Sequence, residues 1–389
     1  MKILFLTFYF EPDLCAGSFR NTPLFKEILN NLREDDFLHV ITTQPNRYSS
    51  FKSKAAAVET GKNYCIERIT LPTHKSGFID QAKAFYVYYV NVLKLTHQNN
   101  YDLVFASSSR LFTAFLGKII AQKQGAKLYL DIRDIFVDTI SDIINNIIIQ
   151  VPLKLILSAV EKYTFSNANH INLVSEDFKW YFSKYSKPSY SFFTNGIDDE
   201  FVNYNQVASE KSIEKNQIII TYAGNIGSGQ GLEKIIPNAA ILLGPEYIFR
   251  IIGDGGKKSA LVDKITEFSL PNVEVINPVS RSELFNYYQE SDFLFLHLNN
   301  LEAFKKVLPS KVFEYAAFNK PIIAGVSGYS QKFIQSNLDN YILFEPTNAE
   351  DFVAKLLVFK VKDCDRSSFV EKFSRKNIIK KMSESILNC

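Results

Sequence analysis

The sequence of 389 residues is poor in the groups that build metal centres and disulfide frameworks. It has four cysteines, Cys15, Cys65, Cys364 and Cys389, and five scattered histidines. The cysteines lie far apart and none belongs to a CxxC motif, which argues against a zinc site or a disulfide framework. We therefore expect free thiols, no bound metal and a reducing compartment, with the cytoplasm as the default location.

The chain also lacks an excess of charge and a long apolar run. Its 44 basic and 41 acidic residues leave a net charge of +3 without a basic stripe, which argues against a dedicated nucleic-acid-binding protein. No stretch reaches the about 18 apolar residues of a membrane span. Residues 1–10 are apolar but lack a small-residue cleavage site, so we expect a buried first strand there rather than a signal peptide.

What the chain has is length and a repeated alternation of apolar runs with helical segments. With 46% hydrophobic residues, it is long enough for two domains with cores of their own. Continuous apolar runs of strand length predict strands buried on both faces, as in a parallel sheet covered by helices. The predicted strands are 2–8, 38–42, 103–106, 127–132, 170–174 and 189–192, and then 218–222, 249–252, 273–275, 293–297, 321–324 and 342–344.

A turn-type segment separates the two series of strands. It begins at Asn195-Gly196 and continues as a polar stretch to Asn216. We therefore predict an α/β protein with two doubly wound, Rossmann-like domains, 1–195 and 196–366, that face each other across a cleft. Such folds bind ligands outside the carboxyl ends of their strands, so the candidate site residues are those that follow predicted strands.

The most informative motif is Pro309-Ser310-Lys311, followed by Glu314 and then by an apolar strand. Proline and serine suit the start of a helix, where the serine oxygen can cap a free N–H. Lys311 falls in the first turn, where a cation is unfavourable unless an anion binds nearby. Glu314 lies on the same helix face, so it could bind a sugar diol while the amides hold phosphate. An ordinary capped helix with a solvated Lys–Glu pair explains the same residues without a ligand.

Two glycine-containing turns follow predicted strands in the second half. Glycines at such points let the backbone approach a ligand closely and direct N–H groups at phosphate. A tight turn with a solvated aspartate is the alternative for the second one. The candidate residues are Gly224, Asn225, Gly227, Gly229 and Gln230 in the first turn, and Gly253 and Asp254 in the second.

Three further candidates follow strands in the first half. Gly17 opens a helix after the first strand, and Arg133 and Asp134 follow the predicted strand 127–132. Charged residues at the end of a buried strand are costly unless they are paired or functional. We therefore regard Arg133 and Asp134 as site residues, with a structural Arg–Asp pair as the alternative.

The run Pro-Ser-Lys-x-x-Glu-Tyr-x-Ala-x-x-x-Pro-Ile that begins at Pro309 resembles the donor-site segment of glycosyltransferase family 4. These are retaining enzymes with the GT-B fold, and the run is similar to the branch that builds surface polysaccharides and O-antigens from N-acetylhexosamines or deoxyaminosugars. The resemblance implies that Glu314 binds the nucleotide ribose, that the chain at Val279 contacts the base, and that Gly17 and Ser310 lie at the donor phosphates. It also implies that the final segment, 367–389, returns to the first domain.

The sequence departs from the family pattern at three positions. Lys306 stands where the family carries a second glutamate, so we expect the backbone at Lys306 to make the donor contact in place of that side chain. Asn225 and Gln230 stand where most relatives carry arginine and lysine. Charge-assisted hydrogen bonds are about twice as strong as neutral ones. We therefore expect Lys311 and the backbone amides of the glycine-rich turn to take more of the anionic load.

The resemblance implies a hexosyl- or N-acetylhexosaminyl-transferase that moves a sugar from a nucleotide-diphosphate donor, expected to be a UDP-sugar, to a lipid-linked saccharide. Lys311, Arg133 and Asp134 are the expected catalytic group, with no metal and no cofactor beyond the donor. The acceptor implies the inner face of the cell membrane, where segments 85–89 and 147–157 could touch lipid, although core packing explains both segments equally well. A GT-B-fold nucleotide-sugar epimerase and a non-catalytic nucleotide-sugar-binding protein are the alternatives.

Overall fold

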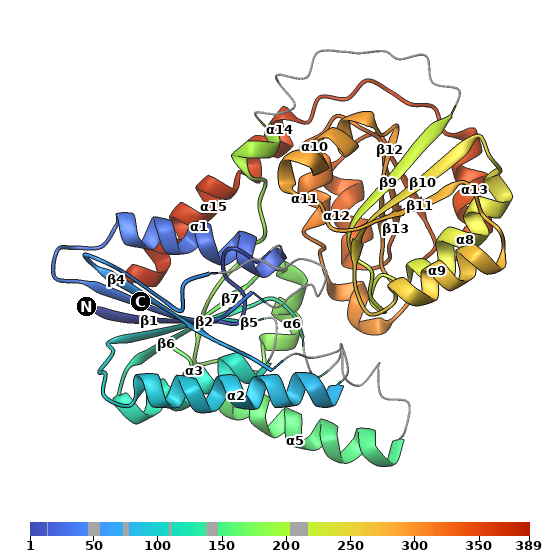
Figure 1. The fold of residues 1–389 in the computed structure, drawn as a ribbon. Coiled ribbons are helices and arrows are strands. Elements are labelled where there is room, and N and C mark those ends of the chain that lie inside the picture. Colours follow the sequence, from blue (N-terminus) through green and yellow to red (C-terminus); the bar gives the residue numbers. More distant parts are fainter. Residues whose placement is uncertain are drawn as a thin grey trace. The chain divides into compact units, whose positions relative to one another are not determined.

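Two compact units divide the chain. One is formed by Met1–Thr194 together with Asn377–Cys389, and the other by Asn195–Lys376. Each unit is an α/β sheet with helices packed on it, so the predicted fold class of two Rossmann-like sheets is confirmed (Figure 1). Part of the polar stretch expected after the hinge, 203–216, lies outside the described residues. The computed structural model describes residues 1–13, 15–45, 55–72, 78–108, 111–135, 137, 147–202 and 217–389.

The first unit is built on eight strands. They are β1 (Lys2–Thr7), β2 (Phe37–Thr43), β3 (Val58–Gly61), β4 (Tyr64–Ile69), β5 (Leu103–Ser108), β6 (Lys127–Ile132), β7 (His170–Leu173) and β8 (Ser189–Ser191). Their order in the sheet is β3-β4-β2-β1-β5-β6-β7-β8. All neighbours are parallel except β3, which is antiparallel to β4. The central strand β1 is buried on both faces, which explains its unbroken apolar run.

The hairpin of β3 and β4 was not predicted from the sequence. Its strand β4 mixes apolar residues with Cys65, Glu67 and Arg68, and β3 is a largely exposed edge strand. Neither therefore shows the continuous apolar run that marks the other strands. The turn-type sequence Gly61-Lys62-Asn63 between them was the available signal.

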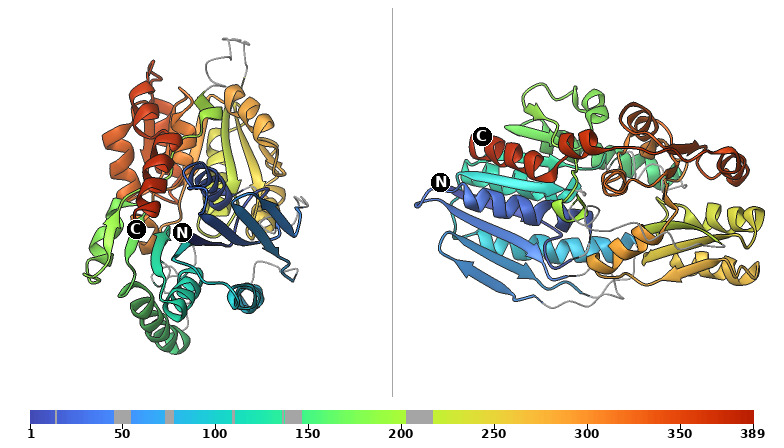
Figure 2. Two further views of the ribbon diagram at one scale, coloured as in Figure 1. Left: turned by 90° about the vertical axis from the view of Figure 1, so that its left-hand side faces the viewer. Right: turned by 90° about the horizontal axis from the view of Figure 1, so that it is seen from above.

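Helices cover both faces of the first sheet. On one face lie α2 (Phe78–Thr96), α3 (Leu111–Gln124) and α5 (Ile147–Phe165), and on the other α1 (Ala16–Asn30) lies beside α15 (Arg375–Leu387) (Figures 1 and 2). A short helical stretch, η1 (Glu176–Phe178) with α6 (Lys179–Phe182), precedes β8.

The C-terminal segment packs on the first sheet through α15. Ile379, Met382 and Ile386 are buried in the same cluster as Phe5 and Phe105. The expected return segment is divided, however, because α14 (Ser367–Lys372) belongs to the second unit and the first unit takes the chain from Asn377.

The second unit is built on six parallel strands in the order β11-β10-β9-β12-β13-β14. Every strand predicted for this half is present. The strands are β9 (Ile218–Asn225), β10 (Tyr247–Asp254), β11 (Val273–Ile276), β12 (Phe293–His297), β13 (Ile322–Gly325) and β14 (Tyr341–Phe344). The helices are α8 (Leu232–Leu243), α9 (Lys258–Glu267), α10 (Arg281–Glu290), η2 (Glu302–Lys306), α11 (Lys311–Ala316), α12 (Tyr329–Asn337) and α13 (Ala349–Val358).

Two further expectations concern cysteines and membrane spans. All four cysteines are free thiols, as predicted. Within the described ranges, none of the helices combines the length and the apolar character needed to cross a membrane.

Candidate functional site

The candidate donor residues of the second unit gather where the strand order reverses. From β9 the chain adds β10 and β11 on one side, whereas β12 pairs with β9 on the other side. At such a point the chain continues from neighbouring strands to opposite sides of the sheet, which leaves room for a ligand at the carboxyl edge. The loops after β9 and β12 border this edge and are in contact, because the backbone N–H of Asn299 donates to the Gly229 carbonyl at 2.8 Å.

Lys311 lies directly against the end of β9. A Cβ atom on Gly224 would lie 2.0 Å from the Lys311 Nζ, and Gly224 has a φ of 143°, so only glycine leaves room for this side chain. The Nζ lies 5.4 Å from the centre of the Tyr222 ring, within the range of a cation–π contact. The structure thus places a cation at the start of the glycine-rich loop, defined here as residues 224–231.

The expected cap at Ser310 is not present. Ser310 is the N-cap residue of α11, but its side chain accepts no capping hydrogen bond. Its backbone already has helical angles (φ −58°, ψ −25°), whereas a capping side chain needs an extended backbone to reach the N–H groups of the first turn. Because α11 has only six residues, it aligns few peptide dipoles, and the charge of Lys311 becomes the main feature of this helix start.

The glycine-rich loop is held together by the two residues that replace the charged side chains of most relatives. Asn225 Nδ2 donates to Gln230 Oε1 at 2.8 Å across the loop. Gly227 makes this possible, because a Cβ atom there would lie 2.4 Å from Asn225 Nδ2. The loop is therefore organised by a neutral amide pair.

His297 also holds the glycine-rich loop in place. Its Nδ1 bonds to the Gln230 carbonyl at 2.6 Å, and its Nε2 accepts from the Thr347 N–H at 2.9 Å. Burial lowers the pKa of His297 to about 4, so the ring stays neutral. His297 is therefore a structural residue with both ring nitrogens satisfied.

The turn that contains Gly253 and Asp254 packs on the glycine-rich loop. A Cβ atom on Gly253 would lie 1.8 Å from the Gly224 carbonyl oxygen, so this close contact of β9 with β10 requires glycine. The Asp254 carboxylate accepts from the Gly255 N–H at 2.8 Å within this turn. Lys258 Nζ joins this turn to Asn277 at 2.7 Å, and thereby to the segment that carries Val279.

Glu314 lies one helical turn after Lys311 and is half-buried. Burial raises the pKa of its carboxyl and Asp198 adds to the rise, while Lys311, Arg281 and Arg375 oppose it. Within the described part of the chain, its carboxylate has neither a hydrogen bond nor an ion pair. A carboxylate so placed can accept hydrogen bonds from a ligand hydroxyl.

No carboxylate takes the place of the second family glutamate among the residues around η2. Lys306 ends this 3₁₀-helix, and Glu302, at its start, is 75% exposed and pairs with Lys305. Val279 is half-buried against the core of the second unit. The roles of Lys306 and Val279 in donor binding stay predictions.

The three candidates of the first unit lie at the carboxyl edge of its sheet. A Cβ atom on Gly17 would lie 3.1 Å from Nη1 of Arg133, so the start of α1 and the guanidinium are neighbours. Burial raises the pKa of Asp134 to about 6, although Arg133 opposes this rise. Asp134 lines a cavity of about 10 Å³ together with Ser108 and Glu161. Within the described residues, no ion pair joins Arg133 to Asp134.

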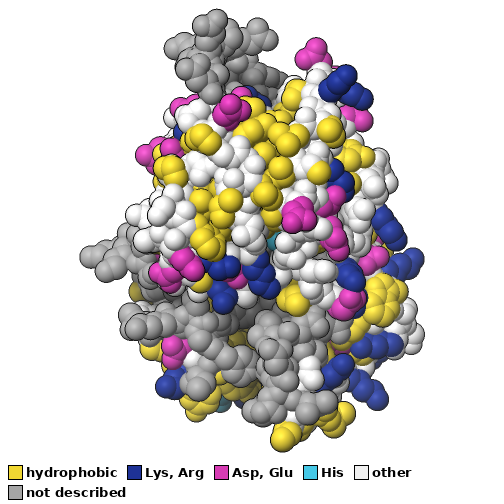
Figure 3. All heavy atoms as spheres, turned by 90° about the vertical axis from the view of Figure 1, so that its right-hand side faces the viewer, with side chains coloured by type: hydrophobic (Ala, Val, Ile, Leu, Met, Phe, Trp, Pro, Cys, Tyr) yellow, Lys and Arg dark blue, Asp and Glu magenta, His cyan; other side chains and the backbone are white. Residues whose placement is uncertain are grey.

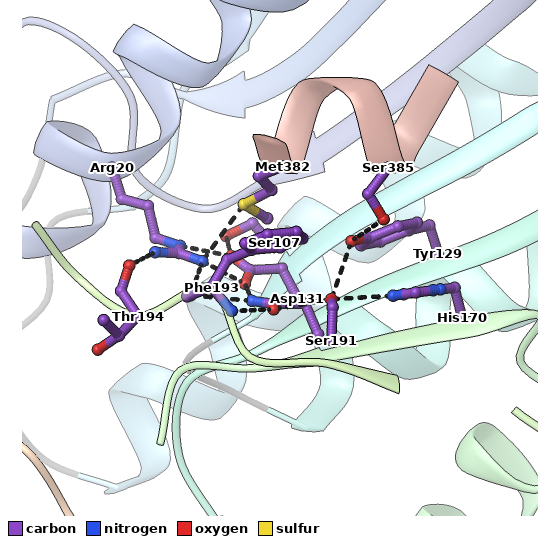
Figure 4. Close-up of polar contacts among 11 residues, drawn as sticks. Arg20, Ser107, Tyr129, Asp131, His170, Ser191, Phe193, Thr194, Met382 and Ser385 are labelled. Carbon is purple, nitrogen blue, oxygen red and sulfur yellow. Dashed lines mark hydrogen bonds and ion pairs between the residues drawn. The ribbon is translucent and has the colours of Figure 1, made fainter. Parts of the chain in front are cut away.

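A structural Arg–Asp pair does exist at this edge, but between other residues (Figure 4). Arg20 forms two hydrogen bonds of 2.9 Å to Asp131 and also donates to the carbonyls of Phe193 and Thr194. Burial alone would raise the pKa of Asp131, but the charge and hydrogen bonds of Arg20 lower it overall. Because Arg20 and Asp131 are 111 residues apart, no local pattern could have revealed the pair.

The part of the chain that the structure describes holds no group of three or more histidine, cysteine, aspartate or glutamate residues arranged to bind a metal ion.

Comparison with known proteins identifies part of the chain. Residues 205–373 match the family model described as Glycosyl transferases group 1. The putative colanic acid biosynthesis glycosyl transferase WcaI of Escherichia coli K12 is 28% identical over 148 residues, which are 38% of this chain and 36% of that protein. The match thus spans about a third of the length of this relative.

Solved structures share the whole two-sheet fold. HepE of Anabaena, in complex with UDP and glucose, has a TM-score of 0.66 and 14% identity over 100% of both chains. An alpha,alpha-trehalose-phosphate synthase (UDP-forming) from Burkholderia vietnamiensis has a TM-score of 0.67 and 10% identity, again over 100% of both. At these identities the likeness shows the fold alone, which is GT-B. Residues 205–373, which lie in the second unit, therefore belong to the family Glycosyl transferases group 1.

Proposed function

We propose that the protein is a retaining glycosyltransferase that moves a sugar from a nucleotide-diphosphate donor, in the first instance a UDP-sugar, to a lipid-linked saccharide in surface polysaccharide synthesis. The observation that carries the proposal is the placement of Lys311 against the glycine-rich loop with the unpaired carboxylate of Glu314 one turn later. The name of WcaI and the ligands in the HepE structure support it.

In this reaction the bond from the anomeric carbon to the diphosphate oxygen breaks, and a bond to the acceptor oxygen forms on the same face. The acceptor proton passes to the leaving phosphate, so no protein nucleophile is required. Lys311 and the amides of Gly227 and Gly229 stabilise the charge that develops on the diphosphate. Glu314 holds the ribose, and we assign Arg133 and Asp134, on the first unit, to contacts with the sugar or the acceptor.

A nucleotide screen tests the donor. We expect UDP and UDP-sugars to raise the melting temperature by several degrees, because a ligand at a hundredfold excess over its Kd stabilises by about 2.7 kcal/mol. GDP, ADP and their sugars serve as controls in the same differential scanning experiment. A shift with GDP instead would reassign the nucleotide, and no shift with any of them would overturn the transferase assignment. Conversion of the donor without an acceptor would indicate the epimerase.

We further propose that α5 brings the protein to the cytoplasmic face of an anionic membrane. Leu155 is 67% exposed, and it shares one helix surface with the exposed residues Ile148 and Val151. The layer of α2, α3 and α5 carries six lysines (Lys83, Lys94, Lys118, Lys123, Lys154 and Lys162) against two acidic residues (Asp80 and Glu161). Exposed apolar residues in a basic helical layer fit a surface of anionic lipid headgroups.

The second unit carries an exposed apolar face that lacks this charge. Hydrophobic side chains gather over its helices in Figure 3, and Ile241, Leu242, Leu357 and Val358 are all more than half exposed. Here α8, α9 and α13 carry four lysines against five acidic residues. The charge therefore distinguishes the two faces, and only the α5 face suits an anionic membrane.

Vesicle binding tests this assignment with matched substitutions. We expect Leu155→Glu to weaken binding to phosphatidylglycerol-containing vesicles at least about tenfold, because a charge replaces buried apolar area and repels the lipid. Leu357→Glu, at a leucine that is 63% exposed on α13, is the control and should bind like the unchanged protein. Equal binding of both variants, or binding that does not depend on anionic lipid, would contradict the assignment. In segment 85–89, which belongs to α2, Tyr88 is buried in the core and Tyr86 is 68% exposed.

A further inference from the structure

The chain enters and leaves the second unit through two segments that are hydrogen-bonded to each other. Ile197 N–H donates to the Phe373 carbonyl and Arg375 N–H donates to the Ile197 carbonyl, both at 2.8 Å. Gly196 allows this approach, because a Cβ atom there would lie 2.7 Å from the Arg375 Cα. The residue that follows this bridge, Asp198, is therefore held in a fixed place.

Asp198 is the shared anion of two arginines from different helices. Its Oδ2 pairs with Nη2 of Arg281, the first residue of α10, and its Oδ1 lies 2.5 Å from Nε of Arg375, the first residue of α15. The Asp198 side chain is only 13% exposed, so solvent screens these pairs weakly. Arg281 has a second, outer partner in Glu200, which lies 3.3 Å away and is 63% exposed.

All three charges act on the ionisation of Glu314. Arg281 and Arg375 favour the ionised form of its carboxyl, as Lys311 does from the same helix, and Asp198 disfavours it. Burial raises the pKa values of the Tyr288 and Tyr315 phenols and Glu314 adds to this rise, so both phenols stay neutral. Two arginines thus lie within electrostatic reach of Glu314, yet both form their ion pairs with Asp198 and none with Glu314.

We propose that Asp198 is a positioning residue that keeps Glu314 open to its ligand by holding Arg281 and Arg375 away from it. Arginine forms strong bidentate pairs with carboxylates, so an arginine whose carboxylate partner is removed pairs with another carboxylate within its reach. Without Asp198, Arg281 keeps its exposed partner Glu200, 3.3 Å away, while Glu314 is the half-buried carboxylate on whose ionisation both arginines act. An Arg–Glu314 pair would occupy the oxygens that, on the proposed function, bind the ribose hydroxyls.

The same contact fixes the loop before α10. Arg281 follows Ser280, which caps α10 through a capping box with Glu283. Asp198 therefore also anchors the segment that contains Val279, the residue expected at the base. Its loss would affect both the ribose and the base ends of the donor pocket, and we expect the Michaelis constant for the donor to rise more than the turnover number falls.

The first measurement needs no ligand. In Asp198→Asn, we expect a crystal structure to show Arg281 or Arg375 in contact with Glu314, and a carboxyl NMR titration to show a lower pKa for Glu314. Glu200→Gln, which removes the exposed partner of the same Arg281, is the matched control and should leave both unchanged. Arginines that stay in place, together with an unchanged Glu314 pKa, would overturn the proposal whatever the nucleotide results are.

The second measurement follows the ligand. We expect Asp198→Asn to weaken UDP binding by about tenfold or more in calorimetry, and the added substitution Arg281→Gln to recover part of this loss, since one competing cation is then gone. A merely structural role predicts a lower melting temperature, weaker binding and no recovery in the double variant, which would contradict the proposal. If the unchanged protein binds no nucleotide, the proposed function fails, while the structure and titration still decide the role of Asp198.

Discussion

Replacing Lys311 by alanine is expected to lower sugar transfer by about two to three orders of magnitude, the loss seen when one preorganised stabiliser of transition-state charge is removed. The reason lies in the glycine-rich loop. Its two amide side chains, Asn225 and Gln230, are neutral and bonded to each other, so they cannot replace the missing charge. Transfer assayed with a radiolabelled donor at saturating concentration measures the effect.

The fold should survive this substitution. Lys311 is half-buried at the edge of the sheet, where its ammonium lies 5.4 Å from the centre of the Tyr222 ring. Lys305→Ala, six residues earlier at an exposed pair with Glu302, is the matched control and should keep full activity. Gly224→Ala should also lower sugar transfer, because a methyl group there displaces the Lys311 ammonium. Full activity in Lys311→Ala would remove Lys311 from the site.

Glu314→Ala is expected to abolish most transfer by a different route. Its carboxylate is assigned to the ribose, so the loss should appear in donor affinity as well as in rate. Because burial raises the pKa of Glu314, acid should weaken donor binding at a higher pH than an ordinary glutamate would allow. In Glu314→Ala, donor binding should no longer weaken as the pH falls through this range. If it still weakens, another group is responsible for the pH dependence.

The fold could be read from the sequence because its strands are buried on both faces. An unbroken apolar run such as that of β1 is hard to place anywhere except inside a parallel sheet covered by helices. The hairpin of β3 and β4 escaped because it lies at the edge, where one face meets water and the apolar run is interrupted. Prediction thus succeeded where burial alone decides the residue type.

The candidate site could be read only in part, and the limit is physical. Residues that follow strands or open helices carry local signals, so Lys311, Glu314 and Arg133 could be named from the sequence. The charge pairs that position them join residues far apart in the chain, as Asp198 does with Arg281, and have no local pattern. Even Ser310 shows this limit, since its type suggested a cap that its helical backbone does not allow.

Asp134→Asn is expected to make the protein more stable at neutral pH while lowering transfer. The pKa of Asp134 in the folded protein, about 6, is above the ordinary value of 3.8. Below about pH 4 the group is protonated in both folded and unfolded chains and costs nothing. As pH rises through about 6, the ionised carboxylate in the folded state costs about 1–3 kcal/mol, which asparagine avoids.

The gain in melting temperature should therefore amount to several degrees at pH 7.5 and vanish near pH 4. Asp35→Asn, at an exposed aspartate of the same unit, should show no such gain. Asp131→Asn should show the opposite, a loss of stability at neutral pH, because Arg20 is left without its anion. A stabilised Asp134→Asn that transfers sugar normally would make Asp134 a carboxyl that merely lines a cavity. Stability gained together with activity lost is the mark of a carboxylate retained for its chemistry.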